Sequence, residues 1–104
     1  MATETTLSPS KGGANGEVQG STSAAQLPSV PCSLAWIKTV SSNAGKVYIG
    51  WSTTVSKVDG TTDVTSGLEL GAGEAFGPVP LDNLNRLWYI CDNAGDDLTY
   101  FTAG

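Results

Sequence analysis

The sequence predicts an all-β fold: a small antiparallel sandwich or barrel of six to seven short strands, preceded by an extended N-terminal arm. Two observations carry this prediction. From Cys32 to Gly104, short apolar segments alternate with turn-forming Gly, Asn and Asp, at the spacing of about 8–12 residues typical of small all-β domains. All eight aromatic residues lie between Trp36 and Phe101. Residues 29–104 are therefore expected to form the domain.

Residues 1–28 are expected to be a flexible or extended arm. The segment before Leu27 consists mainly of Ser, Thr, Gly, Ala and Gln and has no aromatic residue. Such a composition buries too little apolar surface to offset the entropy lost on ordering. We expect that the arm cannot fold by itself, although it can order on a partner as an extended strand or latch. Pro28 and Pro31 make a stiff junction to the domain.

The strands are assigned from alternation and turn chemistry. Both faces of segment 32–40 are apolar, with Trp36 on one and Ile37 on the other, which favours a central position. Segment 46–51 is expected to pair with it as an antiparallel hairpin, and Gly50 indicates a bulge or a close backbone approach. The remaining expected elements are a weak strand at 53–58, β-prone residues at 61–65, a short segment at 68–70, an edge segment at 75–80, one helical turn at 81–85, and strands at 86–91 and 98–102.

Charge and composition exclude several classes of partner. The net charge is −5, and the five basic residues form no cluster, which argues against a nucleic-acid partner. No apolar run approaches the roughly 20 residues of a membrane span, so we expect no membrane partner. The first six residues have neither the basic nor the apolar region of a signal peptide, so we expect synthesis in a cytoplasm.

No catalytic, cofactor-binding or metal-ligating residue is expected, and the chain is not expected to be an enzyme. Histidine, the commonest general base, is absent. Asp92–Asp97 gathers oxygen ligands around Gly95, but a hairpin turn whose side chains bond the local backbone is favoured over a calcium site. Paired carboxylates can support glycoside hydrolysis, but Glu69 and Glu74 are candidates only because they are acidic, and they flank a turn that is expected to be polar anyway.

Two cysteines, Cys32 and Cys91, are expected to be buried, reduced thiols. The alternative is one disulfide across the sheets, which a cytoplasmic origin disfavours. The Tyr89-Ile90-Cys91 motif is similar to the Tyr-x-Cys of immunoglobulin domains. Trp36 follows Cys32 too closely for the core tryptophan of that family, so the sandwich class is favoured without membership of the family.

The aromatic residues are candidates for an interface. Trp88 and Tyr89 are adjacent, so in a strand they point to opposite faces. We expect at least one of Trp51, Trp88 and Tyr89 to lie between subunits. Exposed aromatic side chains are also the usual platform for stacking on sugars, although aromatics in short strands more often pack in a core.

The order of motifs from Pro31 to Phe101 resembles small virion proteins of tailed bacteriophages, over about two-thirds of the chain. The motifs lie at Cys32–Ile37, Asn43–Gly50, Leu68–Glu74, Pro78–Pro80 and Leu84–Ile90, followed by a second Asn-Ala-Gly turn. In those proteins a comparable order belongs to short β-domains of head or fibre-associated components. The resemblance implies a non-enzymatic structural role in a virion that is assembled in the cytoplasm of a bacterial host.

The specific function that this resemblance implies is capsid decoration, or cement. Such a protein binds the lattice of the major capsid protein on the outside of the head, commonly as a homotrimer with extended termini. The alternative is a tail or fibre-associated module that binds glycan on the host surface, with exposed Trp or Tyr as its platform. Aromatics clustered in an open groove would favour the glycan reader, and aromatics buried between sheets or subunits, with an arm extended away from the barrel, would favour decoration.

Overall fold

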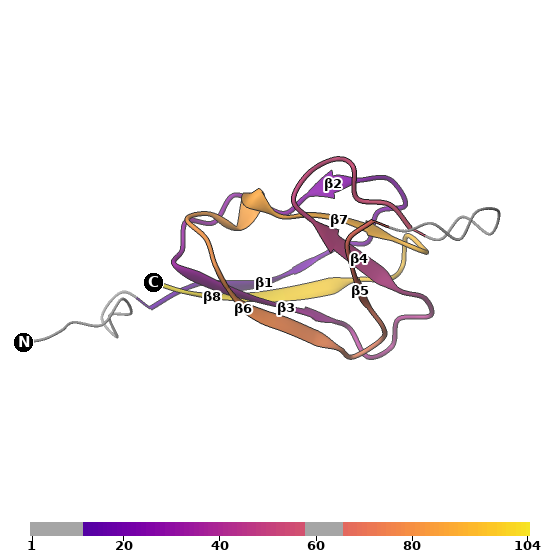
Figure 1. Cartoon of the computed structure of the whole chain (residues 1–104). Helices are drawn as coiled ribbons and strands as arrows, with labels where there is room; N and C mark the ends of the chain where they lie inside the picture. Colours follow the sequence, from indigo (N-terminus) through magenta and orange to yellow (C-terminus); the bar gives the residue numbers. More distant parts are fainter. Residues whose placement is uncertain (1–11, 58–65) are drawn as a thin grey trace, which may run out of the picture.

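The computed structural model describes residues 12–57 and 66–104, which form a sandwich of two four-stranded antiparallel sheets (Figure 1). Sheet A has the order β1 (Asn15–Val18), β8 (Leu98–Ala103), β3 (Leu34–Thr39) and β6 (Ala75–Pro80). Sheet B has the order β2 (Ala25–Gln26), β7 (Trp88–Cys91), β4 (Val47–Gly50) and β5 (Leu68–Leu70), and a 3₁₀ turn, η1 (Leu84–Arg86), precedes β7. The predicted all-β sandwich is confirmed, with eight strands in the described residues in place of six or seven.

The two additional strands lie in the segment that was expected to be an arm. β1 pairs antiparallel with β8, with Asn15 opposite Phe101, and β2 pairs with β7, with Ala25 opposite Tyr89. The segment expected to be a flexible or extended arm thus contributes two edge strands to the sandwich. These strands are stabilised although they contribute few apolar side chains, because each forms backbone hydrogen bonds with the edge of a sheet that later residues build. The expected arm begins with residues 1–11, which lie outside the described residues.

The expected hairpin between segments 32–40 and 46–51 is not formed, because the two strands lie in different sheets. β3 lies between β8 and β6, and β4 lies between β7 and β5, so the predicted central position of the first strand is confirmed. Ile37 on β3 and Ile49 on β4 belong to the same core and reach it from opposite sheets. The turn at 43–45 therefore connects the two layers of the sandwich.

The core fills the space between the sheets. Its members are almost entirely shielded from solvent: Leu27, Cys32, Ala35, Ile37, Val47, Ile49, Leu70, Leu84, Leu87, Tyr89, Cys91 and Leu98. Burying a valine, leucine or isoleucine side chain stabilises a fold by about 1.5–3 kcal/mol relative to leaving it exposed. Leu27, which immediately precedes the Pro28 junction, is thus part of the domain core.

A smaller cluster of Tyr48, Val55 and Ile90 covers the other face of sheet B, with Trp88 packed against it. Residues 53–57 form no strand, which corrects the expected weak strand at 53–58, and residues 61–65 lie outside the described part. Val55 instead folds back over the sheet. A Cβ on Gly50 would lie 2.9 Å from the Val55 Cβ atom, so the close approach predicted at Gly50 is confirmed.

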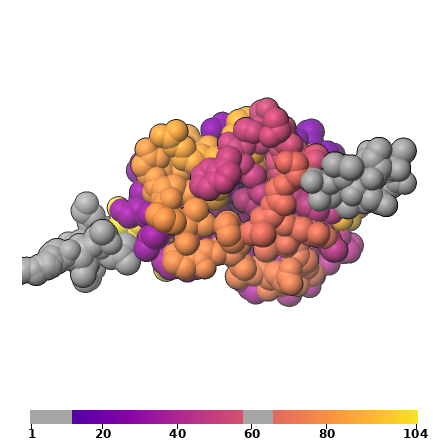
Figure 2. Space-filling view, viewed as in Figure 1, coloured from indigo at the N-terminus to yellow at the C-terminus, as the bar shows by residue number. Residues whose placement is uncertain are grey.

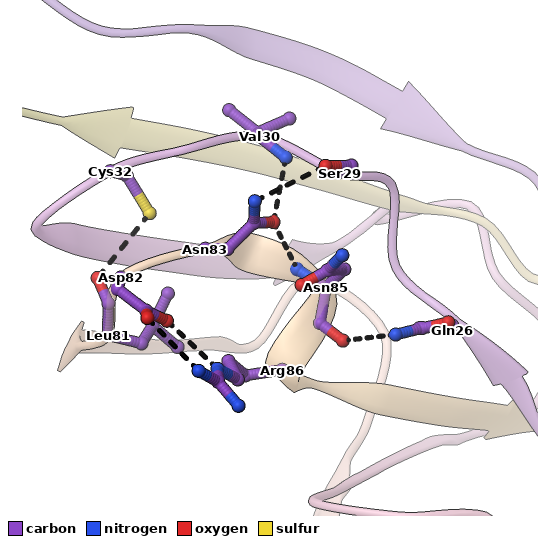
Figure 3. Close-up of polar contacts among 9 residues, drawn as sticks. All are labelled: Gln26, Ser29, Val30, Cys32, Leu81, Asp82, Asn83, Asn85 and Arg86. Carbon is purple, nitrogen blue, oxygen red and sulfur yellow. Dashed lines mark hydrogen bonds and ion pairs between the residues drawn. The ribbon is translucent and has the colours of Figure 1, made fainter.

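The junction between the N-terminal segment and the domain is held by polar contacts around η1 (Figure 3). The Asn83 Oδ1 atom accepts hydrogen bonds from the backbone N–H groups of Val30 and Asn85, both at 2.9 Å, and its amide nitrogen donates to the Ser29 hydroxyl. The Gln26 amide donates to the Asn85 carbonyl at 2.7 Å. The predicted helical turn therefore exists, displaced to Leu84–Arg86, and it anchors the segment that enters from β2.

Candidate functional site

The two Asn-Ala-Gly turns of the sequence lie against each other and form a clamp between the sheets. Each connects sheet A to sheet B, one from β3 to β4 and the other between β7 and β8. The Asn43 side chain donates to the Asp97 carbonyl and accepts from the Asp97 N–H, both at 2.9 Å. The Lys46 N–H donates to the Asp92 carboxylate at 2.9 Å. The two layers of the sandwich are thereby tied together at one end.

Asp96 is the centre of this clamp and is almost completely buried. Its carboxylate accepts hydrogen bonds from the N–H groups of Ala44 and Gly45, and from the N–H and side-chain amide of Asn93, at 2.9–3.3 Å. Burial by itself would raise the pKa of this carboxyl, but the hydrogen bonds outweigh it and hold the pKa below its ordinary value. Both oxygen atoms of the buried carboxylate thus accept hydrogen bonds, and the donors come from both turns.

The Asp92–Asp97 segment is therefore a structural clamp. The expectation of a hairpin turn is wrong in one respect, because the loop joins strands of different sheets and its central carboxylate faces inward. The Asp96 side chain does bond the backbone of its own loop, as expected, and it reaches the neighbouring turn as well. Within residues 12–57 and 66–104, no three acidic or cysteine side chains are grouped closely enough to hold a metal ion.

The carboxylates of Glu69 and Glu74 have separate structural partners. Glu69 forms an ion pair with Lys46 on the exposed face of β4 and β5. Glu74 accepts a hydrogen bond from the Gly71 N–H at 2.6 Å and closes the turn between β5 and β6. The neighbouring Thr39 hydroxyl is buried, donates to the Gly71 carbonyl and accepts from the Glu74 N–H at 3.0 Å. The predicted turn at Gly71–Glu74 is confirmed.

Both cysteines are buried, and no disulfide links them in the structure. Burial raises the pKa of the Cys32 thiol, and the nearby Asp82 carboxylate adds to this effect. Burial also raises the pKa of the Cys91 thiol, whose side chain packs in the core. A raised pKa leaves little of the reactive thiolate at neutral pH, so both thiols are expected to be inert in the folded protein.

We therefore expect two free thiols per chain that become reactive only on unfolding. In the native state, an aromatic disulfide reagent should release product slowly, and in denaturant without reductant it should titrate two thiols rapidly. The raised pKa values and the burial both slow the native reaction. A denatured, unreduced sample without titratable thiol would instead establish the alternative disulfide.

The outer face of sheet A carries an aromatic pair, the half-buried Trp36 and the exposed Phe101. Trp36 on β3 lies directly opposite Phe101 on β8, with ring centroids 5.8 Å apart and ring planes tilted by 59°. Phe101 is 58 % exposed, and Leu34 lies beside the pair on the same face. We call Leu34, Trp36 and Phe101, together with the flanking polar residues Asn15, Glu17, Lys38 and Thr99, the aromatic face. A shallow depression runs along it.

A deeper hollow opens between the edge strands of the two sheets. Leu68 of β5 and Phe76 of β6 line it from sheet B and sheet A, and Trp51 lines it from the segment after β4. The core residues Ile49 and Leu87 also line it, and its volume is about 350 Å³. Figure 2 looks onto this side, where the hollow lies between the orange atoms of residues 76–87 and the salmon atoms of residues 66–74. We call it the Trp51 cleft.

The three predicted interface residues have different environments. Trp51 is 66 % exposed at the cleft and is the most exposed large apolar side chain in the described residues. Trp88 is half-buried against Tyr48 and Val55 on the outside of sheet B. Tyr89 points the opposite way, into the core, and its hydroxyl donates to the Gln19 carbonyl at 2.8 Å. The opposite orientation of Trp88 and Tyr89 is confirmed, and Trp51 is the one of the three that is freely accessible.

The aromatic face was not singled out from the sequence. The signal that could have found it is parity along β3 and β8, because Trp36 alternates with the buried Ala35 and Ile37, and Phe101 with the more buried Tyr100 and Thr102. Both aromatics therefore share a face with polar neighbours such as Lys38 and Thr99.

No protein family, curated protein or solved structure matches this chain. Within the described residues, no helix has the length and apolar character needed to cross a membrane.

Proposed function

We propose that this chain is a non-enzymatic structural protein of a bacteriophage virion, and specifically a capsid decoration (cement) protein. It is made in the cytoplasm of the bacterial host and binds the major capsid protein lattice on the outside of the head, as a homotrimer. The observation that carries the proposal is the aromatic face of sheet A, where Trp36 and Phe101 face outward from a rigid sheet. The motif order from Pro31 to Phe101 supports the same assignment.

The aromatic face has the composition of a docking surface. Protein interfaces combine an apolar centre, enriched in aromatic side chains, with a polar rim that sets orientation. Here Trp36 and Phe101 form the centre, and Glu17 on β1 and Lys38 on β3 flank it with opposite charges. Because these side chains stand on paired strands, little conformational entropy is lost when the face docks.

Decoration acts through mass action. A protein that binds the assembled lattice and not the separate capsid subunits stabilises the lattice by RT ln(1 + [L]/Kd), where [L] is its free concentration. A saturating decoration protein at about 100 Kd thus contributes about 2.7 kcal/mol per site. Because this contribution is repeated at every site of a head, a small domain without catalytic chemistry can greatly increase the resistance of the head to heat or pressure.

The proposal is tested on heads that were prepared without this protein. We expect the purified chain to co-sediment with them to a fixed copy number per head and to raise the temperature at which the heads rupture. Phe101→Ser should weaken this binding at least about thirtyfold, as for an interface hot spot. Arg86→Ser is the control, since Arg86 is an exposed side chain outside the aromatic face. The absence of the chain from purified virions, or unchanged binding by Phe101→Ser, would refute the proposal.

The second candidate is a tail or fibre-associated module that binds host surface glycan. It is favoured by the depression beside Phe101, where Asn15, Glu17, Lys38 and Thr99 offer hydrogen-bonding groups next to an exposed ring. Against it, the 59° tilt prevents Trp36 and Phe101 from forming one flat platform. Retention of the chain on host surface polysaccharide, lost in Phe101→Ser and without any binding to heads, would establish this function in place of decoration.

A further inference from the structure

We propose that copies of this chain contact one another through the Trp51 cleft, with Trp51 and Leu68 of one copy packing against the cleft of its neighbour. The assignment rests on the self-association included in the proposed function and names its surface. It also separates two roles, since the aromatic face of sheet A binds the lattice while the cleft joins copies of the chain. The two surfaces belong to different parts of the sandwich, one on the outer face of sheet A and one between the edge strands β5 and β6.

The shape of the cleft calls for an apolar protrusion. Its lining includes Ile49 and Leu87, which are at most 3 % exposed and belong to the core, so the hollow reaches between the sheets. Two of the three exposed large apolar side chains in the described residues, Trp51 and Leu68, stand beside it. In the closed ring of three copies proposed above the contacts are head to tail, so Trp51 and Leu68 of each copy can pack against the cleft of the next.

The charge distribution favours a second copy as the occupant. The chain carries a net charge of −5, so identical copies repel one another unless they meet where acidic groups are absent. No described residue that lines the cleft is charged; besides the apolar residues it contains only glycines and the hydroxyl residues Ser52, Thr54 and Ser66. By contrast, the aromatic face carries the charged residues Glu17 and Lys38, which can orient the chain against complementary charges of a different protein.

The strands that flank the cleft are sheet edges, whose unpaired backbone groups a neighbouring copy would cover. β5 and β6 are the edge strands of sheets B and A on this side, and β5 has only three residues. The prolines of β6 blunt its edge, whereas β5 contains no proline. A second copy seated over the cleft would cover the β5 edge and bury Trp51, the residue type most enriched in interface hot spots.

The test is sedimentation equilibrium of the purified full chain over a wide range of concentration. We expect reversible association to a closed oligomer. Trp51→Ser should raise the dissociation constant at least about thirtyfold, and Leu68→Glu, which puts a charge at the contact, should do the same. Phe101→Ser is the matched control, because Phe101 is nearly as exposed as Trp51, at 58 % against 66 %, and should leave the association unchanged. Near-UV circular dichroism checks that each variant is folded.

Each outcome bears on the cleft independently of the virion role. Dissociation by Trp51→Ser and Leu68→Glu, but not by Phe101→Ser, supports the assignment even if the chain never binds heads. A wild-type chain that stays monomeric at every concentration overturns it, as does dissociation by Phe101→Ser alone, which would make the aromatic face the self-contact. A monomer whose Trp51 becomes protected only in the virion would identify another protein as the occupant and also overturn it.

Discussion

A chain that begins at Leu27 is expected to lose the native two-sheet fold, although the removed residues contain no aromatic side chain. The deletion takes away β1 and β2 and opens an edge of each sheet. It also removes carbonyl acceptors for three groups: the Thr102 N–H, bonded to Ala14 at 2.8 Å, the Cys91 N–H, bonded to Ser21 at 2.7 Å, and the Tyr89 hydroxyl. At about 1 kcal/mol for each net hydrogen bond, the loss is a large share of the about 5–15 kcal/mol that stabilises a small domain.

Urea denaturation followed by near-UV circular dichroism measures this effect. The control is a chain that begins at Gly12, which keeps every contact described above, and its midpoint is the reference for the longer deletion. Adding the peptide of residues 12–26 in excess to the chain from Leu27 should restore the near-UV signal, because strand addition and mass action favour the paired state. A chain from Leu27 that unfolds at this reference midpoint would show that β1 and β2 are dispensable.

The fold class was predictable because it depends on local patterns. Alternation places Trp88 and Tyr89 on opposite sides of β7, and the prolines of segment 75–80 restrict β6 to an edge. Gly50 signals the close approach of Val55. Each of these inferences uses only a residue's stereochemistry and its immediate neighbours, which a sequence displays directly.

The pairing partners were not predictable, because they depend on residues far apart in the chain. The turn at Asn43–Gly45 has the composition of a hairpin turn, yet it connects β3 in sheet A to β4 in sheet B. β1 and β2 are polar because an edge strand contributes few side chains to the core, so composition alone classed them with the arm. Their strand structure depends on β8 and β7, about sixty to ninety residues later.

The candidate surfaces were predictable in part. Trp51 was anticipated as an interface residue and is accessible, while Tyr89 turned out to be a core residue. The aromatic face was missed because the exposure of Phe101 depends on which side of sheet A faces sheet B. Likewise, the inward orientation of Asp96 arises only when the Ala44–Gly45 turn lies over it. The exposed or buried state of a polar loop residue is set by the tertiary neighbour and not by the loop.

Replacing Asp96 by alanine is expected to be the most damaging single change in the clamp. The substitution leaves the N–H groups of Ala44, Gly45 and Asn93 without their acceptor. Because hydrogen bonds to a charged group are strong and unpaired buried donors are costly, we expect a loss of about 3–4 kcal/mol in the free energy of unfolding. Asp92→Ala is the matched control: Asp92 is half-buried, its carboxylate accepts from the Lys46 N–H, and its loss should cost about 1 kcal/mol.

The effect of Asp96 should also depend on pH in a defined direction. Because the folded state lowers the pKa of this carboxyl, its contribution is complete above the unfolded-state value of about 3.9 and is lost as the pH falls through the folded-state value. Asp96→Asn has no charge at any pH. The difference in stability between wild type and Asp96→Asn, measured by urea denaturation, should therefore be largest near neutral pH and shrink progressively below about pH 4. A difference that stays constant from neutral to acidic pH, or an Asp92→Ala variant less stable than Asp96→Ala, would show that the buried carboxylate does not hold the two turns together.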